Sequence, residues 1–265
     1  MESNSNISPK VVTVVNQKGG VGKTTTAINL ASSLAFLGKK VVLVDFDPQG
    51  NASSGLGVGL EKRSVTSYDV LIEKKSLKDA LVFCKQKGLW VVPANTDLSS
   101  ADLTLAKSEE KVTAFSSSLA SFFSVMNEID YVFVDCPPSL NLLTVNALVA
   151  SDSAIVPLQP EFFALEGLSQ LLLTIRDIRK IANEGLRLEG VVLTMYDGRN
   201  NLTKQVEEDA RNNLGDLVFK TVIPRNVKLS EAPSYGEPIL RYSPKSSGNK
   251  AYMNLAEEFL KRQET

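Results

Sequence analysis

Short apolar runs, mostly of β-branched residues, alternate along the chain with longer stretches in which apolar positions recur every three or four residues. The first run covers residues 11–15, and runs of the same character cover residues 41–44 and 131–134. Runs that stay apolar without alternation are typical of parallel strands buried on both faces. The remaining predicted strands are Leu89–Val92, Ala154–Leu158, Gly190–Met195 and Val218–Ile223.

Stretches with helical periodicity separate most of these strands. Beyond residue 23, one helix face would carry Ala27, Leu30, Ala31, Leu34 and Leu37, and Gly38 supplies a stop. The alternation of strand and helix predicts an α/β fold, a mostly parallel twisted sheet with helices on both faces. Further predicted helices are Ser67–Ile72, Leu98–Lys107, Val112–Met126, Leu142–Ala150, Glu166–Asn183, Lys204–Leu214 and Lys250–Arg262.

A glycine-rich segment joins the first predicted strand to the first predicted helix. Glycines there let backbone N–H groups turn toward an anion at the start of a helix. Lys23 would reach the β- and γ-phosphates of a nucleotide, and the Thr24 hydroxyl would ligate Mg²⁺. Strand, loop and helix in this order are the context that a phosphate-loop match requires. The segment consists of Lys18, Gly19, Gly20, Val21, Gly22, Lys23, Thr24 and Thr25.

The loop departs from the usual phosphate-loop pattern in one place. The pattern begins with a glycine where this chain has Gln17, and the next residue is a second lysine, Lys18, ahead of the usual Lys23. Two ammonium groups around one triphosphate need an explanation that the loop alone does not give.

Carboxylates follow two other predicted strands. Asp45 and Asp47 come at the end of the run at 41–44, and Asp135 closes the run at 131–134. Ligands of open parallel sheets bind at the carboxyl ends of the strands. Each aspartate taken alone is equally compatible with a helix N-cap or a turn. Together with the glycine loop they favour phosphate chemistry with Mg²⁺, in which Asp135 would be the second-sphere partner of the metal.

These residues resemble the deviant Walker ATPases of the ParA/MinD group, and within it the small chromosomal ParA branch, often called Soj. The likeness implies a single P-loop ATPase domain over residues 10–265. The polar segment 1–9 before it is predicted to be a disordered tail. The resemblance covers nearly the whole chain, and it rests on Lys18 and on the segments 44–51, 135–139, 165–168 and 223–234.

The resemblance implies a role for each residue of the site. In that group the signature lysine, here Lys18, reaches across a homodimer interface to the phosphates of the partner. Lys23 would hold phosphate, and Thr24 would hold Mg²⁺. Asp47 would position or activate the attacking water beside the metal, and Asp135 would support the metal shell. Contacts to the adenine, partly through backbone, are implied for Met195, Pro224 and Asn226.

Composition narrows the chemistry. The 265 residues include no histidine, which excludes histidine triads, imidazole metal sites and histidine general bases. The two cysteines, Cys84 and Cys136, form no Cys-x-x-Cys pair and are expected to be buried or half-buried residues in a reducing cytoplasm. Cys136 could otherwise ligate an iron–sulfur cluster, but no second cysteine has suitable spacing. No apolar run has the length of a transmembrane helix.

Charge leaves room for a local DNA-binding surface. The net charge of −1 argues against a molecule that binds DNA over its whole surface. Residues 225–250 include five basic and two acidic residues, a local charge of 5 − 2 = +3, and are predicted to be exposed loop. The resemblance places nonspecific DNA contacts at Arg199 and Lys228. The group usually has arginine at the second position, where lysine keeps the charge. The alternative is that these charges are merely solvated.

The expected function is that of a weak, partner-stimulated ATPase that acts as a switch in chromosome or plasmid segregation. By resemblance, an ATP-bound sandwich dimer binds nonspecific double-stranded DNA, and a ParB-type centromere-binding protein stimulates the hydrolysis that resets it. The expected location is cytoplasmic and nucleoid-associated. The partner's identity, the hydrolysis rate and the choice between segregation and replication control are left open by the sequence.

Three other functions compete with this one. The main alternative is a MinD-like membrane-associated positioning ATPase, in which the last helix would be amphipathic and basic. Here Glu257, Glu258 and Glu264 oppose an anionic surface, so the last helix is expected to pack on the body, without stable membrane association. A small-molecule kinase or synthetase, or a non-catalytic nucleotide-binding scaffold, remain as further alternatives.

Overall fold

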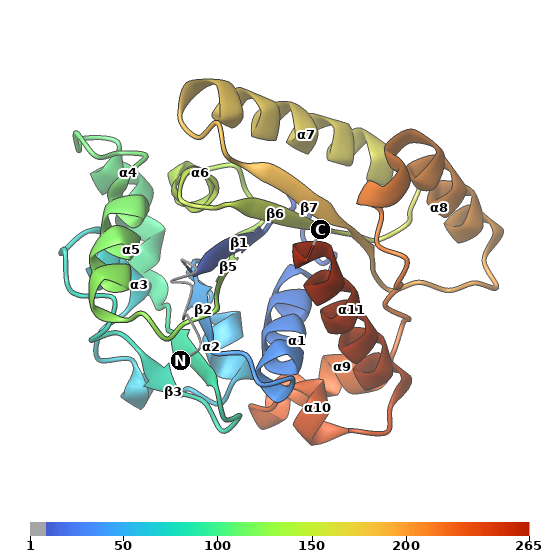
Figure 1. Cartoon of the computed structure of the whole chain (residues 1–265), viewed down its shortest axis with the longest axis horizontal. Coiled ribbons are helices and arrows are strands. Elements are labelled where there is room, and N and C mark those ends of the chain that lie inside the picture. Colours follow the sequence, from blue (N-terminus) through green and yellow to red (C-terminus); the bar gives the residue numbers. More distant parts are fainter. Residues whose placement is uncertain (1–8, 265) are drawn as a thin grey trace, which may run out of the picture.

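The computed structural model describes residues 9–264, so the predicted tail over residues 1–9 lies outside the described part except for Pro9. Within that part, one seven-stranded sheet has the strand order β3-β4-β2-β5-β1-β6-β7 (Figure 1). All neighbours pair in parallel except the edge strand β3, which is antiparallel to β4. The strands are β1 (Lys10–Val14), β2 (Val41–Asp45), β3 (Val82–Phe83), β4 (Leu89–Val92), β5 (Tyr131–Asp135), β6 (Ser153–Leu158) and β7 (Arg187–Leu193).

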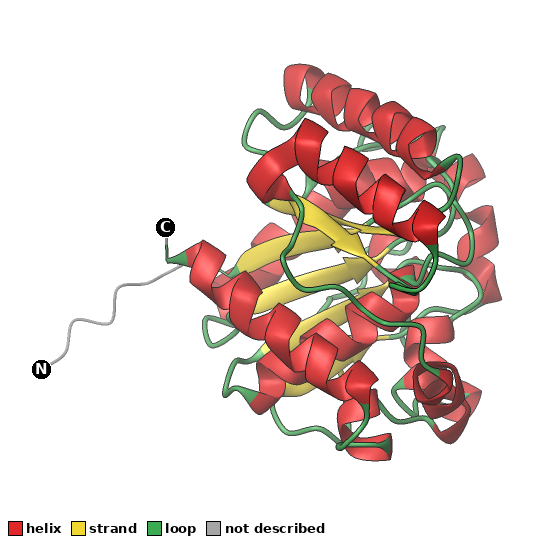
Figure 2. Cartoon of the chain, turned by 90° about the vertical axis from the view of Figure 1, so that its right-hand side faces the viewer, coloured by secondary structure: helices red, strands yellow, loops and turns green. Residues whose placement is uncertain are grey.

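Helices cover both faces of the sheet, as the alternating pattern predicted (Figure 2). The α-helices are α1 (Lys23–Phe36), α2 (Asn51–Gly55), α3 (Ser67–Leu71), α4 (Ala101–Leu105), α5 (Ala114–Val125), α6 (Leu142–Val149), α7 (Ala164–Ile181), α8 (Asn201–Leu214), α9 (Val227–Glu231), α10 (Ile239–Tyr242) and α11 (Ser247–Gln263). Short 3₁₀ helices cover Leu60–Lys62, Thr96–Ser100, Gly215–Leu217 and Ala232–Tyr235. No helix among the described residues is both long and apolar enough to cross a membrane.

Two hydrophobic cores lie on the two faces of the sheet. Because successive strand side chains point to opposite faces, Val12 and Val14 of β1 join the core that contains α1 and α11. Val11 joins the core that contains α5, α6 and α7. This arrangement explains why the buried strands read as continuous apolar runs, since both faces of each strand need an apolar side chain.

The last helix packs on the body, as its sequence predicted. Leu255 and Phe259 of α11 are completely buried. The Phe259 ring packs against the rings of Tyr131 and Phe133 of β5, with centroids 5.4 and 5.8 Å away. The apolar face of α11 is therefore used within the chain, where it covers the sheet beside α1 (Figure 1).

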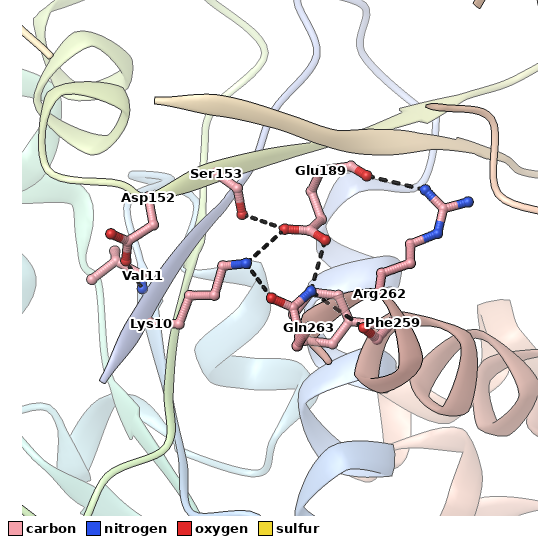
Figure 3. Close-up of polar contacts among 8 residues, drawn as sticks. All are labelled: Lys10, Val11, Asp152, Ser153, Glu189, Phe259, Arg262 and Gln263. Atoms are coloured by element: carbon pink, nitrogen blue, oxygen red, sulfur yellow. Dashed lines mark hydrogen bonds and ion pairs between the residues drawn. The ribbon is translucent and has the colours of Figure 1, made fainter. Parts of the chain in front are cut away.

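A polar network ties the far end of α11 to the strands (Figure 3). The Glu189 carboxylate of β7 accepts hydrogen bonds from Lys10 Nζ at 3.1 Å, Ser153 Oγ at 2.7 Å and Gln263 Nε2 at 2.7 Å. The Arg262 guanidinium donates to the Glu189 carbonyl at 3.2 Å. This network closes the amino edge of the sheet, opposite the edge where the strands end.

One predicted strand does not form. Val218–Ile223 makes a single bridge, Val191 to Val218, instead of an eighth strand. The reason is a competing acceptor, because the Glu258 carboxylate of α11 takes the backbone N–H groups of Lys220 and Thr221 at 2.8 and 2.9 Å. The N–H groups of Phe219 and Ile223 do donate to the Val191 and Leu193 carbonyls of β7, at 2.9 and 2.8 Å. Because successive N–H groups of a strand point to opposite sides, the one that the Glu258 side chain diverts from the ladder is that of Thr221.

The segment 225–250 is also different from its prediction as exposed loop. It contains α9, a 3₁₀ turn, α10 and the first turn of α11. The Asn226 side chain caps α9 by accepting from Lys228 N at 2.8 Å, and Ser246 caps α11 by accepting from Asn249 N at 3.1 Å. Helices of four or five residues are too short to show a periodicity in the sequence. Their capping residues were the sequence features that could have predicted them.

Smaller differences concern helix ends. The predicted helix Leu98–Lys107 is divided into a 3₁₀ turn, Thr96–Ser100, and α4. Leu37 is the exposed C-cap of α1 rather than a member of its buried face, since Gly38 at φ 89° turns the chain there.

Removing the Phe259 side chain tests the packing of α11. We expect Phe259→Ala to lower the free energy of unfolding by about 3–5 kcal/mol, because it leaves a cavity between α11 and the sheet. Urea unfolding followed by circular dichroism measures this loss. Phe36→Ala is the matched control, since that side chain is 60% exposed and its loss should cost less than about 1 kcal/mol. Equal losses for the two variants would contradict the packing.

Candidate functional site

The glycine loop between β1 and α1 is held in a defined shape. Gly20 and Gly22 have φ of 77° and 84°, in the left-handed region that favours glycine, and Gly22 is the N-cap of α1. The Val21 carbonyl accepts a hydrogen bond from Thr194 Oγ1, just past β7, at 2.8 Å. The loop therefore presents the N-terminus of α1 at the edge of the sheet and is fixed there by the end of β7.

Asn16 fixes the other end of the loop, a role for which no signal was found in the sequence. Its buried side chain donates from Nδ2 to the Pro157 carbonyl of β6 at 2.7 Å. Its Oδ1 accepts from the Lys18 backbone N at 3.0 Å. The start of the loop is thus attached to β6 through one amide side chain.

The two lysines of the loop point in different directions. Lys23 is only 7% exposed, and its Nζ donates to the Lys18 carbonyl at 3.0 Å. Burial lowers the pKa of Lys23, and the nearby carboxylates of Asp135 and Asp47 act against that shift. Lys18 lies at the surface, where its Nζ forms an ion pair with Glu161, between β6 and α7. One ammonium group faces the interior of the site and the other faces outward.

Asp45 is a structural residue. It is completely buried, and its Oδ2 accepts from Ser53 N at 2.8 Å and from Ser53 Oγ at 2.7 Å. Its Oδ1 accepts from Asp47 N at 3.1 Å. Burial raises the pKa of Asp45 to about 6, although the hydrogen bonds from Ser53 oppose the shift. Of the two roles that the sequence allowed, the turn-forming one describes Asp45, which holds the segment between β2 and α2.

Asp135 is buried without regular hydrogen bonds. It pairs in register with Asp45 across β5 and β2, and neither of its carboxylate oxygens has a hydrogen-bond partner that meets normal geometry among the described residues. Burial raises its pKa well above the usual value, and the charge of Asp45 adds to the rise. The Thr24 hydroxyl and the Lys23 ammonium lie near enough to oppose it.

This arrangement fits a divalent cation. A buried carboxylate without partners is costly unless a cation or a donor compensates it. No group of three or more acidic, cysteine or histidine side chains within residues 9–264 could hold a metal by itself. A magnesium ion at Thr24 would therefore have to share its ligands with phosphate oxygens and water, which is the usual habit of Mg²⁺.

Asp47 lies at the mouth of the same cluster. It is half-buried, and its Oδ1 accepts from Gln49 N at 2.9 Å. Its charge acts on both Lys23 and Asp135. The fold thus brings Lys23, Asp47 and Asp135 together at one edge of the sheet, although they are separated by more than 20 residues along the chain.

A pocket of about 220 Å³ adjoins the glycine loop and contains the predicted adenine residues. Met195, at φ 48°, holds a left-handed conformation that is strained for a residue with a side chain. The Asn226 side chain donates to Ser247 Oγ and accepts from Lys228 N at the start of α9. The backbone groups of Asn226 are therefore the ones that could contact an adenine base. The lining includes Gly22, Thr25, Met195, Pro224 and Asn226.

A larger groove, about 1110 Å³, lies at the opposite edge of the sheet. It is lined by Lys10, Glu189 and Arg262 among others, and so belongs to the polar network that closes that edge. Because it is separated from the glycine loop by the length of the strands, its size does not make it the candidate site.

The two candidate DNA-binding residues lie in neighbouring segments, Arg199 in the loop after β7 and Lys228 in α9. A bridge between Tyr196 and Pro224 joins the loop after β7 to the loop before α9. The Arg199 side chain is 91% exposed and contacts the Asp197 carboxylate at 2.9 and 2.8 Å, which lowers the pKa of Asp197 to about 2. Lys228 pairs with Glu231 at 2.8 Å.

Within residues 225–250, Lys228 lies near α10. Its Nζ is 5.7 Å from the centroid of the Tyr242 ring, and Arg241 is the residue before Tyr242. Arg241 also lines a groove with Phe36 and Met253.

The cysteines have the packing role that was expected. Cys136 is buried behind Asp135, and burial raises its pKa. Cys84 is half-buried, and burial raises its pKa to about 12. Both are free thiols, and neither has the low pKa that marks a reactive cysteine.

Comparisons with known proteins agree with this geometry. A family model described as AAA domain matches residues 9–188. The chain is 50% identical over 254 residues to the chromosome partitioning protein ParA of Caulobacter vibrioides, covering 96% of this chain and 95% of that protein. It is 49% identical over 251 residues to the sporulation initiation inhibitor protein Soj of Bacillus subtilis, covering 94% and 97%.

A solved structure matches nearly the whole fold. The crystal structure of cobyrinic acid a,c-diamide synthase from Mycobacterium smegmatis, with a bound ATP analogue and magnesium, superposes with a TM-score of 0.83 at 35% identity. The match covers 97% of this chain and 96% of that chain.

Neutralising Asp135 tests the cost of its burial. Its pKa is raised on folding, so the contribution of Asp135 to stability decreases as the pH rises from the unfolded pKa, about 3.9, toward the folded one. Asp135→Asn removes this decrease. In the absence of nucleotide we expect the variant to be more stable than wild type by about 1–3 kcal/mol at pH 8, with a smaller gain at pH 5. Thermal unfolding at several pH values measures the difference.

The exposed residue Asp216 supplies the control, since Asp216→Asn should follow wild type at every pH. Asp135→Asn should also bind Mg²⁺ and nucleotide more weakly, which isothermal titration would detect. A stability difference that does not grow with pH would contradict the assignment of Asp135 as a buried, uncompensated carboxylate.

Proposed function

This chain belongs to the ParA and Soj family of chromosome-partitioning ATPases, and from that premise we propose that it is an ATP-dependent switch that pairs on DNA. In this proposal two ATP-bound subunits form a sandwich dimer that binds double-stranded DNA without sequence preference. Hydrolysis returns the subunits to monomers that leave the DNA.

The observation that carries the proposal is that one lysine of the loop is buried and the other lies at the surface. Lys23 is buried beside Asp135, where its charge would meet a phosphate bound by the same subunit. Lys18, in the same loop, lies at the surface, where its ammonium can reach a second subunit. A nucleotide held between two subunits would give the Lys18 ammonium a phosphate to contact in the partner.

The other residues of the loop and its surroundings complete the nucleotide site. The backbone N–H groups of the loop and Lys23 would hold the phosphates of ATP, and Thr24 would hold Mg²⁺ with Asp135 behind it. The metal would neutralise phosphate charge when bound. Asp47, at the mouth of the cluster, would position the attacking water. The adenine would occupy the pocket lined by Met195 and Pro224.

DNA contacts are proposed at Arg199 and Lys228. Each is held by an acidic neighbour, Asp197 and Glu231, but exposed ion pairs of this kind contribute only about 0–1 kcal/mol. DNA phosphates can therefore replace these neighbours at little cost. Arg199, in the loop after β7, and Lys228, in α9, closely follow the pocket residues Met195 and Asn226 along the chain, so a nucleotide there would be close to the surface that meets DNA.

The packing of α11 argues against the MinD-like alternative. A helix that lies on lipid needs a free apolar face, and the apolar residues Leu255 and Phe259 are buried against the sheet. The described part of the chain thus leaves this helix without a face for membrane binding. We propose instead a cytoplasmic, nucleoid-associated protein whose hydrolysis is stimulated by a ParB-type centromere-binding partner.

A small-molecule synthetase is the alternative that the Mycobacterium smegmatis structure raises by its name. Such an enzyme needs a pocket for an acceptor beside the γ-phosphate position, with polar groups of its own. The pocket that adjoins the loop measures about 220 Å³ and is lined by the residues proposed for the adenine. The partitioning function is therefore favoured.

DNA binding with a non-hydrolysable ATP analogue tests the proposal. We expect the analogue to tighten binding of wild type to duplexes of any sequence, and salt to weaken it strongly. Arg199→Ala and Lys228→Ala should each weaken binding uniformly across sequences and lower the salt slope by about 1 for each DNA phosphate that the variant no longer neutralises. Fluorescence anisotropy over a range of salt concentrations measures both effects.

Lys180→Ala is the matched control, because that exposed lysine ends α7, far from the nucleotide site, and its loss should change nothing. Lys18→Ala should still bind the analogue but gain no affinity for DNA. If Lys18→Ala bound DNA as tightly as wild type in the presence of the analogue, the proposal that pairing through Lys18 raises DNA affinity would be wrong. Pelleting with anionic liposomes in ATP, without a gain in DNA affinity, would favour the MinD-like function.

A further inference from the structure

We propose that Glu161 is a positioning residue that holds Lys18 within its own subunit and thereby sets how readily two subunits pair. The inference rests on the proposed dimer, and it concerns a residue that the sequence did not single out. Its basis is the ion pair between Lys18 Nζ and Glu161 Oε2, which joins the glycine loop to the connection between β6 and α7.

The Glu161 carboxylate is itself oriented. Its Oε1 accepts from Gln159 Nε2 at 2.6 Å, and the backbone N of Glu161 donates to the Gln159 carbonyl at 2.9 Å. One oxygen is thus occupied by a neighbour two residues away, and the other is left for Lys18. The connection after β6 therefore offers Lys18 a fixed acceptor rather than a freely rotating side chain.

The main chain of Lys18 is held as well. Its N–H donates to Asn16 Oδ1 at 3.0 Å, and its carbonyl accepts from Lys23 Nζ at 3.0 Å. A Lys23 ammonium that turned to a phosphate would give up the Lys18 carbonyl. Glu161 would then be what still restrains the Lys18 side chain, and pairing of two subunits would have to break that ion pair.

The surroundings of Glu161 suit a surface that meets a second copy of the chain. Phe162 and Phe163, directly after it, are 75% and 69% exposed, and their rings pack edge to face with centroids 4.9 Å apart. Large exposed aromatic side chains that lie together are typical of protein–protein contacts. The residue that holds Lys18 therefore lies beside an apolar surface at the mouth of the nucleotide site.

The size of the effect follows from exposure. The Lys18 and Glu161 side chains are 46% and 47% exposed, so their ion pair is screened by water. Exposed pairs of this kind change an equilibrium constant by about 1.4- to 5-fold. Because a dimer breaks the ion pair twice, once in each subunit, removing it should favour the dimer by about 2- to 25-fold. A change of this size would alter the protein concentration at which ATP-bound subunits pair. It would be too small to make them pair without ATP.

The test uses Glu161→Gln, which keeps the shape and removes the charge. The first measurement is the rate at which an amine-reactive reagent labels Lys18 in the nucleotide-free monomer, read by mass spectrometry of the peptide. The second is the dimer dissociation constant with a non-hydrolysable ATP analogue, from sedimentation. We expect faster labelling of Lys18 and, by the same arithmetic, a dimer about 2- to 25-fold tighter.

Two variants serve as controls. Glu161→Asp keeps the carboxylate and should stay nearer to wild type in both measurements. Glu184→Gln removes an exposed carboxylate just beyond the far end of α7 and should change neither. If Glu161→Gln labelled Lys18 no faster, or if labelling rose while the dimer did not tighten, the restraint would be refuted although wild type still paired with ATP. A wild-type chain that never paired would instead refute the proposed function, and the restraint with it.

Discussion

The structure depends on the burial of charge at the carboxyl edge of an otherwise apolar sheet. Lys23, Asp45 and Asp135 all lie there with little or no exposure. Asp45 is compensated by Ser53, which anchors the segment after β2. Asp135 has no such partner, and the buried ammonium of Lys23 only partly offsets its charge. The apolar sheet supplies the low-dielectric setting that makes the cluster sensitive to an added cation or phosphate.

A hydrogen bond and an ion pair connect this buried cluster to the surface. Lys23 donates to the Lys18 carbonyl, and the Lys18 ammonium pairs with Glu161, so the interior and exterior ends of the site meet in one residue. Thr194 holds the loop to the end of β7, and Asn16 holds it to β6.

Sequence reasoning was most successful where periodicity and strand ends carry the signal. It predicted the sheet between two helical layers and the meeting of Lys23 with Asp135, because continuous apolar runs show which strands are buried. It was wrong about Val218–Ile223, where Glu258, 35 residues or more further along the chain, accepts the Thr221 N–H that would continue the ladder. It also did not identify Glu161, because an ion pair between two distant loops leaves no trace in local pattern.

The claim that a nucleotide brings two subunits together through Lys18 is tested most directly by mass. Sedimentation equilibrium of wild type and Lys18→Ala, each with a non-hydrolysable ATP analogue and Mg²⁺, measures it. We predict that wild type reaches twice the 28.8 kDa of a single chain, while Lys18→Ala binds the analogue and stays at 28.8 kDa. A dimer of Lys18→Ala as stable as that of wild type would contradict the claim.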